Sequence, residues 1–330
     1  EKITNAVIKV TSAKKKTVCL VEGHGEPDAE NVEDARAYGQ LNAALVNESY
    51  EIQRMLLATQ EEPPTDCAVM IVPAGEKPWL EPELALFKAY LAGGGRAIVL
   101  FSARKPTQLT PILAEYGVQV GEDVVVDQVI RLFQGPALGV EPIANTYAPD
   151  HPITEKFNQR TIFPLTRSVE PAETAAEGVA ATALVKSGQT AWAESDLKGV
   201  FEKGEAVDDE GKDRKGPITL AVAATIAAKS ADAKEGEAAP SESRLVVFGS
   251  DEFANNKNLQ SFYNRDLILN AVGWAAGEEN LVSIRPRGLR SSRVQLTAGE
   301  MTTIFYLSVL GLPELLLLIG VVVSLRRRGA

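Results

Sequence analysis

The sequence predicts an α/β protein with a mostly parallel sheet and one C-terminal transmembrane helix. From Thr17 onward, short apolar runs alternate with amphipathic stretches, a rhythm typical of βαβ units. Residues 301–325 are almost entirely apolar, and three arginines follow directly. A helix of these 25 residues would be roughly 37 Å long, enough to cross a hydrocarbon core of ~30 Å. We therefore expect a water-soluble body held at a membrane by one helix.

Residues 1–130 carry the clearest strand and helix signals and are expected to form a parallel α/β subdomain. Continuous apolar runs that end at Gly, Pro or polar residues predict strands covered on both faces. Amphipathic stretches between them predict the covering helices, joined by right-handed crossovers. The predicted strands are 18–21, 50–57, 68–72, 97–101 and 124–126, and the predicted helices are 34–46, 83–91 and 107–116.

Residues 131–280 are expected to continue the body as a strand-rich region that ends in an amphipathic helix. Pro, Gly and Asn recur after Gln128, which indicates an irregular connector. The predicted strands are 161–169, 179–185, 218–226 and 245–248, the predicted helix is 259–276, and 281–284 is expected to form a last edge strand. Little helix separates these strands, so part of the sheet is expected to depart from simple βαβ winding.

Arginines flank the predicted membrane helix on both sides. The C-terminal group is Arg326, Arg327 and Arg328 in a tail over 326–330, and the preceding group is Arg285, Arg287, Arg290 and Arg293 in a juxtamembrane segment over 281–300. The positive-inside rule makes the first group cytoplasmic and the body extracytoplasmic, whereas the second group argues for the reverse. We favour an extracytoplasmic body because the triplet abuts the apolar segment and large domains translocate largely regardless of charge. Both groups are expected at the membrane surface.

Composition excludes several classes of function. A net charge of −10 argues against a nucleic-acid partner, which would require a basic face. With only His24 and His151, a histidine-rich metal site is excluded, and we expect no metal and no cofactor. Cys19 and Cys67 lie in apolar runs, so we interpret them as buried strand thiols, with a disulfide as the open alternative.

Three loops that follow predicted strands carry polar side chains, and ligands gather at such strand ends in open α/β sheets. His24 with Glu26 and Asp251 could form an acid/base set or a weak metal site. The alternatives are a ligand or peptide pocket and, favoured here, simple capping of turns and helices. The candidate contact residues are His24, Glu26, Arg104 and Asp251. Ser102 lacks the G-x-S-x-G context of an exposed nucleophile, and neither a Walker A loop nor G-x-G-x-x-G is present, so no catalytic residue is assigned.

Glu314 stands near the middle of the apolar segment, next to Pro313. A charged carboxylate at that depth is costly, by several kcal/mol. Glu314 could be protonated there, or it could face a polar group on another membrane helix. We hypothesise that it marks a contact with a helix of a multi-pass partner.

The chain resembles the auxiliary, substrate-binding-like components of gliding-motility-type ABC transporters, a family of uncharacterised ABC-2-type transport proteins. The motifs that carry this resemblance, in order, are Gly23-His24-Gly25-Glu26, Val72-Pro73, Leu91-Ala92-Gly93-Gly94-Gly95-Arg96, His151-Pro152-Ile153-Thr154, Trp192, Gly216-Pro217-Ile218, Gly249-Ser250-Asp251, Asn264-Arg265-Asp266-Leu267, Asn270-Ala271-Val272-Gly273-Trp274 and Ile284-Arg285-Pro286-Arg287. The resemblance implies an extracytoplasmic body of class I glutamine amidotransferase-like fold, tethered beside an ABC permease with a separate cytoplasmic ATPase. It also implies a membrane helix upstream of Glu1. That fold normally carries a nucleophilic Cys where this chain has Ser102, so catalysis is not implied.

We accordingly expect a non-catalytic, membrane-anchored auxiliary component of an ABC-type transport complex in the inner cell membrane, with its C-terminus in the cytoplasm. The expected partners are the permease, the ATPase and the lipid bilayer, and a homo-oligomer is compatible with the sequence. Two alternatives stay open. One is a membrane-tethered hydrolase that uses His24, Glu26 and Asp251, and the other is a structural envelope scaffold.

Overall fold

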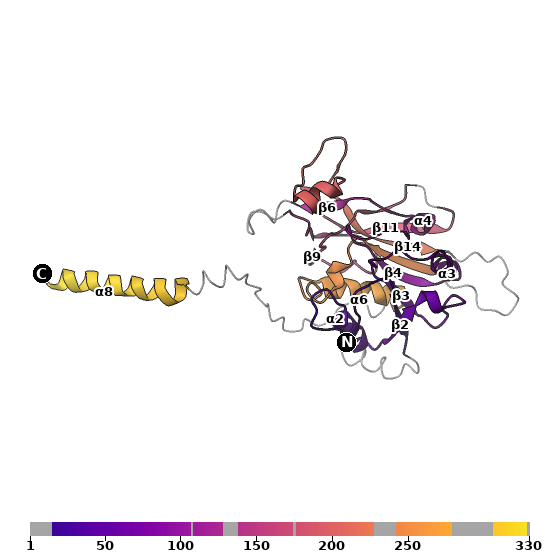
Figure 1. Ribbon diagram of the computed structural model, residues 1–330, viewed down its shortest axis with the longest axis horizontal. Coiled ribbons are helices and arrows are strands. Elements are labelled where there is room, and N and C mark those ends of the chain that lie inside the picture. The colour runs from indigo at the N-terminus through magenta and orange to yellow at the C-terminus, as the bar shows by residue number, and fades with distance from the viewer. Residues whose placement is uncertain are drawn as a thin grey trace. The chain divides into compact units, whose positions relative to one another are not determined.

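The computed structural model describes residues 15–106, 108–127, 138–173, 176–227, 242–278 and 306–328. The chain divides into two compact units, Glu1–Arg285 and Pro286–Ala330. The first unit is the α/β body, and the second contains the apolar C-terminal helix (Figure 1).

An eight-stranded mixed sheet forms the centre of the body. Its strands, in spatial order, are β2 (Glu51–Leu56), β1 (Thr17–Glu22), β3 (Val69–Val72), β4 (Arg96–Leu100), β15 (Ser243–Phe248), β14 (Thr219–Ile226), β11 (Val179–Lys186) and β8 (Thr146–Tyr147). Neighbours from β2 to β15 are parallel, and those from β15 to β8 are antiparallel. The predicted α/β class is confirmed, and the strand-rich continuation supplies half of this sheet.

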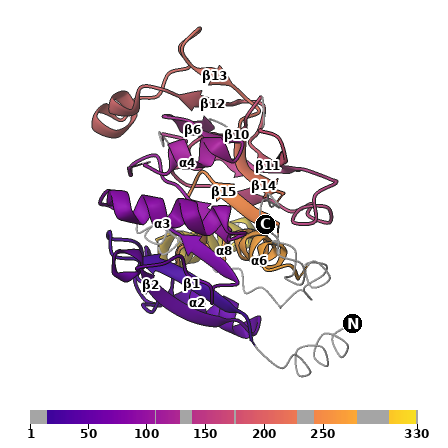
Figure 2. The same cartoon turned by 90° about the vertical axis from the view of Figure 1, so that its right-hand side faces the viewer.

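Helices cover both faces of the sheet, as Figures 1 and 2 show for α3 and α6 on opposite sides of the strands. These helices are α2 (Gly39–Asn47), α3 (Glu81–Ala92), α4 (Thr110–Glu115) and α6 (Asn264–Ala275). Alternate strand residues pack on different helices because successive side chains of a strand point to opposite faces. Ile98 of β4 joins the core that includes α2 and α6, whereas Val99 joins the core that includes α3 and α4. This double burial explains the continuous apolar runs in the sequence.

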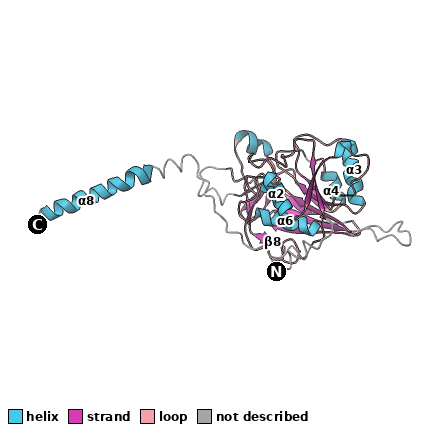
Figure 3. Ribbon diagram, turned by 90° about the horizontal axis from the view of Figure 1, so that it is seen from below, coloured by secondary structure: helices cyan, strands magenta, loops and turns pink. Residues whose placement is uncertain are grey.

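Smaller sheets extend the body, in which Figure 3 distinguishes strands, helices and loops by colour. They are the three-stranded sheet of β13 (Arg214–Lys215), β12 (Ala191–Glu194) and β6 (Val124–Asp127), the pair β10 (Val169–Pro171) and β5 (Val118–Val120), and the pair β7 (Ile143–Ala144) and β9 (Thr161–Ile162). The short helical turns are η1 (Leu57–Thr59), η3 (Gly199–Lys203) and η4 (Glu252–Ala254). Trp192 and Val200 pack with β6 in a small separate core.

Several predicted elements differ from the structure near their ends. The predicted helix 259–276, for example, begins only at Asn264, and the predicted helix 107–116 only at Thr110. The predicted strand 161–169 is two short strands, because Pro164 has no N–H for a ladder and Leu165 has a positive φ of 49°. The predicted helix 34–46 begins only at Gly39. A turn precedes it, in which the Asn31 side chain accepts hydrogen bonds from the backbone N–H groups of Glu33 and Asp34.

Cys19 and Cys67 form a disulfide, which corrects the interpretation of both residues as free thiols. Cys19 lies on β1, and Cys67 lies two residues before β3. These strands are parallel neighbours, with Val18 level with Val69, so the two Cα atoms are only 5.7 Å apart. That separation is typical of a disulfide.

The C-terminal helix comprises a π-helical turn, Leu307–Gly311, followed by α8, Leu312–Arg328. Within the described residues, one segment, Leu307–Arg328, is long and apolar enough to cross a membrane, with 22 residues and a mean hydropathy of 2.2. The predicted edge strand at 281–284 lies outside the described residues, as do Arg285, Arg287, Arg290 and Arg293.

Candidate functional site

The loops that follow β1, β3, β4 and β15 meet at one edge of the sheet. The four strands are adjacent and parallel, and Leu100 of β4, for example, pairs with Phe248 of β15. Their carboxyl ends therefore lie side by side, where open α/β sheets place their ligands. We call the segments 23–26, 73–79, 102–105 and 250–255 the carboxyl-edge loops. All four candidate contact residues of the sequence lie in them.

His24 is held between two carboxylates. Its Nδ1 lies 3.2 Å from Oε1 of Glu26, and its Nε2 lies 2.9 Å from Oε2 of Glu83 on α3. The backbone N–H of His24 also donates to Glu26 Oε2 at 2.7 Å, and the indole of Trp79 stacks on the imidazole with centroids 5.8 Å apart. Both ring nitrogens of His24 thus face a carboxylate oxygen within hydrogen-bond distance. His24 therefore ties the loop after β1 to the start of α3.

Glu83 was not anticipated as a site residue. It lies at the N3 position of α3, where its Oε2 also accepts the backbone N–H of Leu80 at 2.8 Å. This reach back to the helix start is half of a capping box. Its side chain is buried, and within the described residues Oε1 has no hydrogen-bond partner. A Glu in the first turn is typical of a helix start, but nothing in the sequence connects Glu83 with His24.

Asp251 is paired with Lys105, a residue that sequence reasoning passed over. Lys105 Nζ donates to Asp251 Oδ2 at 2.9 Å and to the backbone carbonyl of Ala74 at 2.9 Å, and it lies 3.6 Å from Glu76 Oε1. One ammonium thus joins the loops after β3, β4 and β15. The phenol of Tyr38 donates to the backbone carbonyl of Asp251 at 2.6 Å, and burial raises the pKa of Tyr38 well above its usual value.

Arg104 faces away from this arrangement. Its guanidinium lies over the ring of Phe201 in η3, 4.7 Å from the ring centroid. The sequence predicted Arg104 as a contact residue together with Asp251. In the structure, the neighbouring Lys105 is the residue that lies beside Asp251. His24 and Glu26 are in direct contact, but Asp251 belongs to the separate Lys105 pair. The hypothesised acid/base set is therefore divided between two clusters. His24 and Glu26 form one, and Asp251 with Lys105 forms the other.

Gly75 connects these two clusters through the backbone. A Cβ at this position would lie 2.9 Å from the Cβ of His24 and 3.2 Å from Glu26 Oε1. Only glycine lets the loop after β3 approach the His24 side chain so closely. The next residue, Glu76, faces Lys105.

Arg167 is a third residue that the sequence did not predict for the site, and it binds the backbone of the loop after β4. Its buried guanidinium donates from Nε to the carbonyl of Ser102 at 2.8 Å. Its terminal nitrogens donate to the carbonyls of Gly121 at 3.0 Å and Lys105 at 3.2 Å. Burial lowers the pKa of Arg167, and the nearby carboxylate of Asp123 opposes this effect. The guanidinium supplies hydrogen-bond donors in a fixed geometry to backbone carbonyls that lie outside the sheet ladders.

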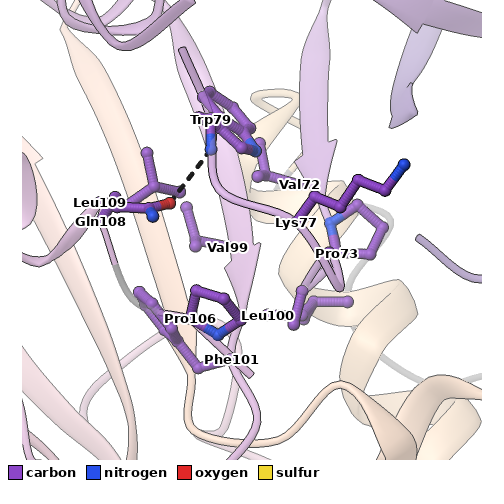
Figure 4. Close-up of a pocket in the computed structure, with 12 residues that line it drawn as sticks. Val72, Pro73, Lys77, Trp79, Val99, Leu100, Phe101, Pro106, Gln108 and Leu109 are labelled. Carbon is purple, nitrogen blue, oxygen red and sulfur yellow. Dashed lines mark hydrogen bonds between the residues drawn. The ribbon is translucent and has the colours of Figure 1, made fainter. Parts of the chain in front are cut away.

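A small pocket opens between the ends of β3 and β4 (Figure 4). Apolar side chains dominate its walls, and the backbone N–H of Trp79 donates to Gln108 Oε1 across its rim at 3.1 Å. The lining residues are Val72, Pro73, Ala74, Gly75, Lys77, Trp79, Val99, Leu100, Phe101, Pro106, Gln108 and Leu109. Its volume of about 20 Å³ suits a water molecule or a methyl group, whereas ligand pockets hold several hundred. Within the described residues, no group of three His, Cys, Asp or Glu side chains is arranged to hold a metal ion.

The Lys105–Asp251 pair makes stability depend on pH. Burial raises the pKa of Asp251 from 3.8 to about 6, although Lys105 acts in the opposite direction. Because the pKa of Asp251 is higher in the folded protein than in the unfolded chain, protonation of Asp251 stabilises the fold. This contribution is complete below pH 3.8 and is lost as the pH rises through about 6. We expect the unfolding free energy of the wild type to fall by roughly 2 kcal/mol relative to Asp251→Asn between pH 4 and pH 7. Thermal unfolding of both proteins across that range measures the difference.

Lys105→Met is the matched control for this pH dependence. Removing the ammonium raises the pKa of Asp251 further, so the transition should move to higher pH. A difference between the wild type and Asp251→Asn that stays constant from pH 4 to pH 7 would contradict the assignment.

The structure defines a protein with an α/β body, a mixed sheet and an apolar C-terminal helix. Residues 15–271 match the model of a family described as an ABC-type uncharacterized transport system. The chain belongs to this family, whose members are auxiliary components of ABC-type transport systems.

Solved structures resemble this one at low sequence identity. The mmIFT52 N-terminal domain superposes with a TM-score of 0.53 at 16% identity, and the match covers 82% of this chain and 100% of that domain. Cytoplasmic protein STM3548 from Salmonella typhimurium gives 0.43 at 14% identity, with 78% and 98% covered. A ThuA-like protein from Parabacteroides merdae gives 0.42 at 10% identity, with 80% and 90% covered. No curated protein matches the sequence. At these identities, the likeness concerns the fold alone.

Proposed function

We propose that this chain is a non-catalytic, membrane-anchored auxiliary subunit of an ABC-type transport complex, and that it presents its α/β body outside the cytoplasm. Membership of the ABC transport family over residues 15–271 carries the proposal. Such a subunit works beside a permease and a cytoplasmic ATPase. The motif order from Gly23 to Arg287 supports the narrower assignment to gliding-motility-type systems with a substrate-binding-like body.

Two features support anchoring in the inner membrane with the body outside. The helix Leu307–Arg328 has the length and hydropathy of a membrane span, and Arg326, Arg327 and Arg328 end it with the positive charge typical of the cytoplasmic side. The Cys19–Cys67 disulfide supports the same orientation because disulfides persist in oxidising compartments and are rare in the cytosol.

The geometry of the carboxyl-edge loops favours contact rather than catalysis. The two nitrogens of His24 are engaged by carboxylates, and the carboxylate of Asp251 is engaged by Lys105. The Ser102 side chain is buried, so it is not presented as a nucleophile. The parallel half of the sheet, β2 to β15, supports a relation to class I glutamine amidotransferase-like folds without their nucleophilic cysteine.

Affinity purification of the full-length protein in mild detergent tests the proposal. We expect an ABC permease and its ATPase to be recovered in a fixed ratio to the bait, measured by quantitative mass spectrometry. A tagged, unrelated single-span protein from the same membrane is the control for non-specific recovery. Recovery of the bait alone, while other membrane complexes stay intact, would contradict the proposal.

A separate assay distinguishes the subunit from a tethered hydrolase. The purified full-length protein should not turn over a panel of ester and amide substrates. Turnover that disappears in His24→Ala but survives in Arg104→Ala would establish an enzyme instead. Arg104 is the matched control because it lies in a carboxyl-edge loop but faces Phe201.

A further inference from the structure

The membrane helix carries a single carboxylate within its apolar length. Between Tyr306 and Leu325, Glu314 is the only charged residue. It precedes Arg326 by 12 positions, which is about 18 Å along a helix. If the arginines mark one surface of a core ~30 Å thick, Glu314 lies close to the middle. Ionisable residues at that depth usually face another helix and pair there.

The helix cannot satisfy this carboxylate by itself. Residues three and four positions away are the ones that share its face. These are Leu310, Gly311, Leu317 and Leu318, none of which has a side-chain donor. The side chain of Glu314 is exposed, as are those of Leu317 and Leu318. The donor must therefore come from outside this segment.

The backbone next to Glu314 is irregular as well. A π-helical turn, Leu307–Gly311, leads directly into α8, and Pro313 precedes Glu314. Proline has no N–H, so the carbonyl one turn earlier loses its helical donor. In membrane helices a local π-helical turn can re-satisfy the groups that proline frees, and such turns occur often at functional sites. An irregular stretch of backbone and a carboxylate thus lie within about one turn of each other.

We propose that Glu314 docks against a hydrogen-bond donor, cationic or neutral, in a membrane helix of the permease. This inference rests on the proposed function. Charge complementarity selects the occupant, because Glu314 offers a carboxylate and Leu310, Gly311, Leu317 and Leu318 offer no side-chain donor. A second copy of the chain would bring a second carboxylate to the first, which fits poorly without a shared proton. A helix of different sequence that carries Lys, Arg, His, Asn, Gln, Ser or Thr at the same depth fits better.

The test compares variants of the full-length protein in mild detergent, with the permease recovered per bait measured by quantitative mass spectrometry. We expect Glu314→Leu to lower recovery at least tenfold and Glu314→Gln, which keeps an acceptor, to retain a large part of it. Leu316→Ala is the matched control because position 316 lies on the opposite face of the helix from Glu314. Alkaline carbonate extraction should show equal membrane integration for all variants.

Each outcome is decisive. Wild-type recovery of the permease by Glu314→Leu would overturn the docking of Glu314 and leave the proposed function intact. A wild type that recovers neither permease nor ATPase would overturn the proposed function, and this inference with it. If two differently tagged copies co-purify in the wild type and separate in Glu314→Leu, while permease recovery is unchanged, the occupant is a second copy and the permease assignment is wrong.

Discussion

Replacement of both Cys19 and Cys67 by alanine is expected to lower the unfolding free energy by about 4 kcal/mol. The disulfide links residues 48 positions apart, and closing a loop of that length in the unfolded chain removes conformational entropy of this order. For a body of this size, the loss corresponds to a fall in Tm of roughly 10 °C. Intrinsic tryptophan fluorescence of the full-length protein in mild detergent, recorded on heating, measures it.

The reduced wild type is the internal control for this effect. It keeps both sulfur atoms and their packing, so a similar fall in Tm after reduction assigns the loss to the bond itself. Thiol labelling before and after reduction also reports the compartment, because a body outside the cytoplasm should label only after reduction. A double variant that melts within about 2 °C of the wild type would contradict the expectation.

The parallel half of the sheet could be predicted because its strands are buried on both faces. Val69 to Val72 and Ala97 to Leu100 are continuous apolar runs, and the structure divides each between two helical layers. Helix α3 was predicted close to its observed bounds because Gly93 and Gly94 end it. These signals are local, and so they survive in a single sequence.

Strand order could not be predicted by the same means. β15 pairs with β4 although about 140 residues separate them, and no local pattern specifies that pairing. The disulfide depends on the same kind of information, since Cys19 and Cys67 meet only because β1 and β3 are neighbours. Long-range pairing decides both features.

The candidate site shows the same contrast between local contacts and contacts over long sequence distances. His24 and Glu26 are two residues apart in one loop, and their contact is local in the sequence. Glu83 reaches His24 from 59 residues away, and Arg167 reaches Ser102 from 65 residues away. Arg104 was predicted at the site, but Lys105 is the residue beside Asp251, and this error has a different cause. Within a turn, adjacent side chains point in different directions, and the sequence alone does not say which one faces the site.

Arg167→Ala is expected to lower the unfolding free energy by about 4 kcal/mol. The substitution removes the charge-assisted hydrogen bonds from the guanidinium to the carbonyls of Ser102, Gly121 and Lys105, and each such bond contributes ~1.5–3 kcal/mol. Removing the buried guanidinium returns part of that sum, because its desolvation is relieved. Thermal unfolding of the full-length protein in mild detergent measures the net change.

Hydrogen exchange locates the effect of Arg167→Ala within the fold. Exchange should rise first in the loop 102–105. Arg167 binds the carbonyls of Ser102, Ala103 and Lys105 in this loop, and its fourth partner is the carbonyl of Gly121. Arg167→Lys should fall between wild type and alanine, since one ammonium cannot span carbonyls that the guanidinium fork reaches together.

Arg160→Ala is the matched control for Arg167→Ala, because Arg160 is an exposed arginine nearby in the chain, and its loss should change stability by less than ~0.5 kcal/mol. Equal effects of Arg160→Ala and Arg167→Ala would show that the loop does not depend on the buried guanidinium. If instead Arg167→Ala alone loosens the loop 102–105, Lys105 loses its anchor and with it the tie to Asp251. The carboxyl-edge loops would then owe their shape to a side chain that reaches them from the antiparallel side of the body.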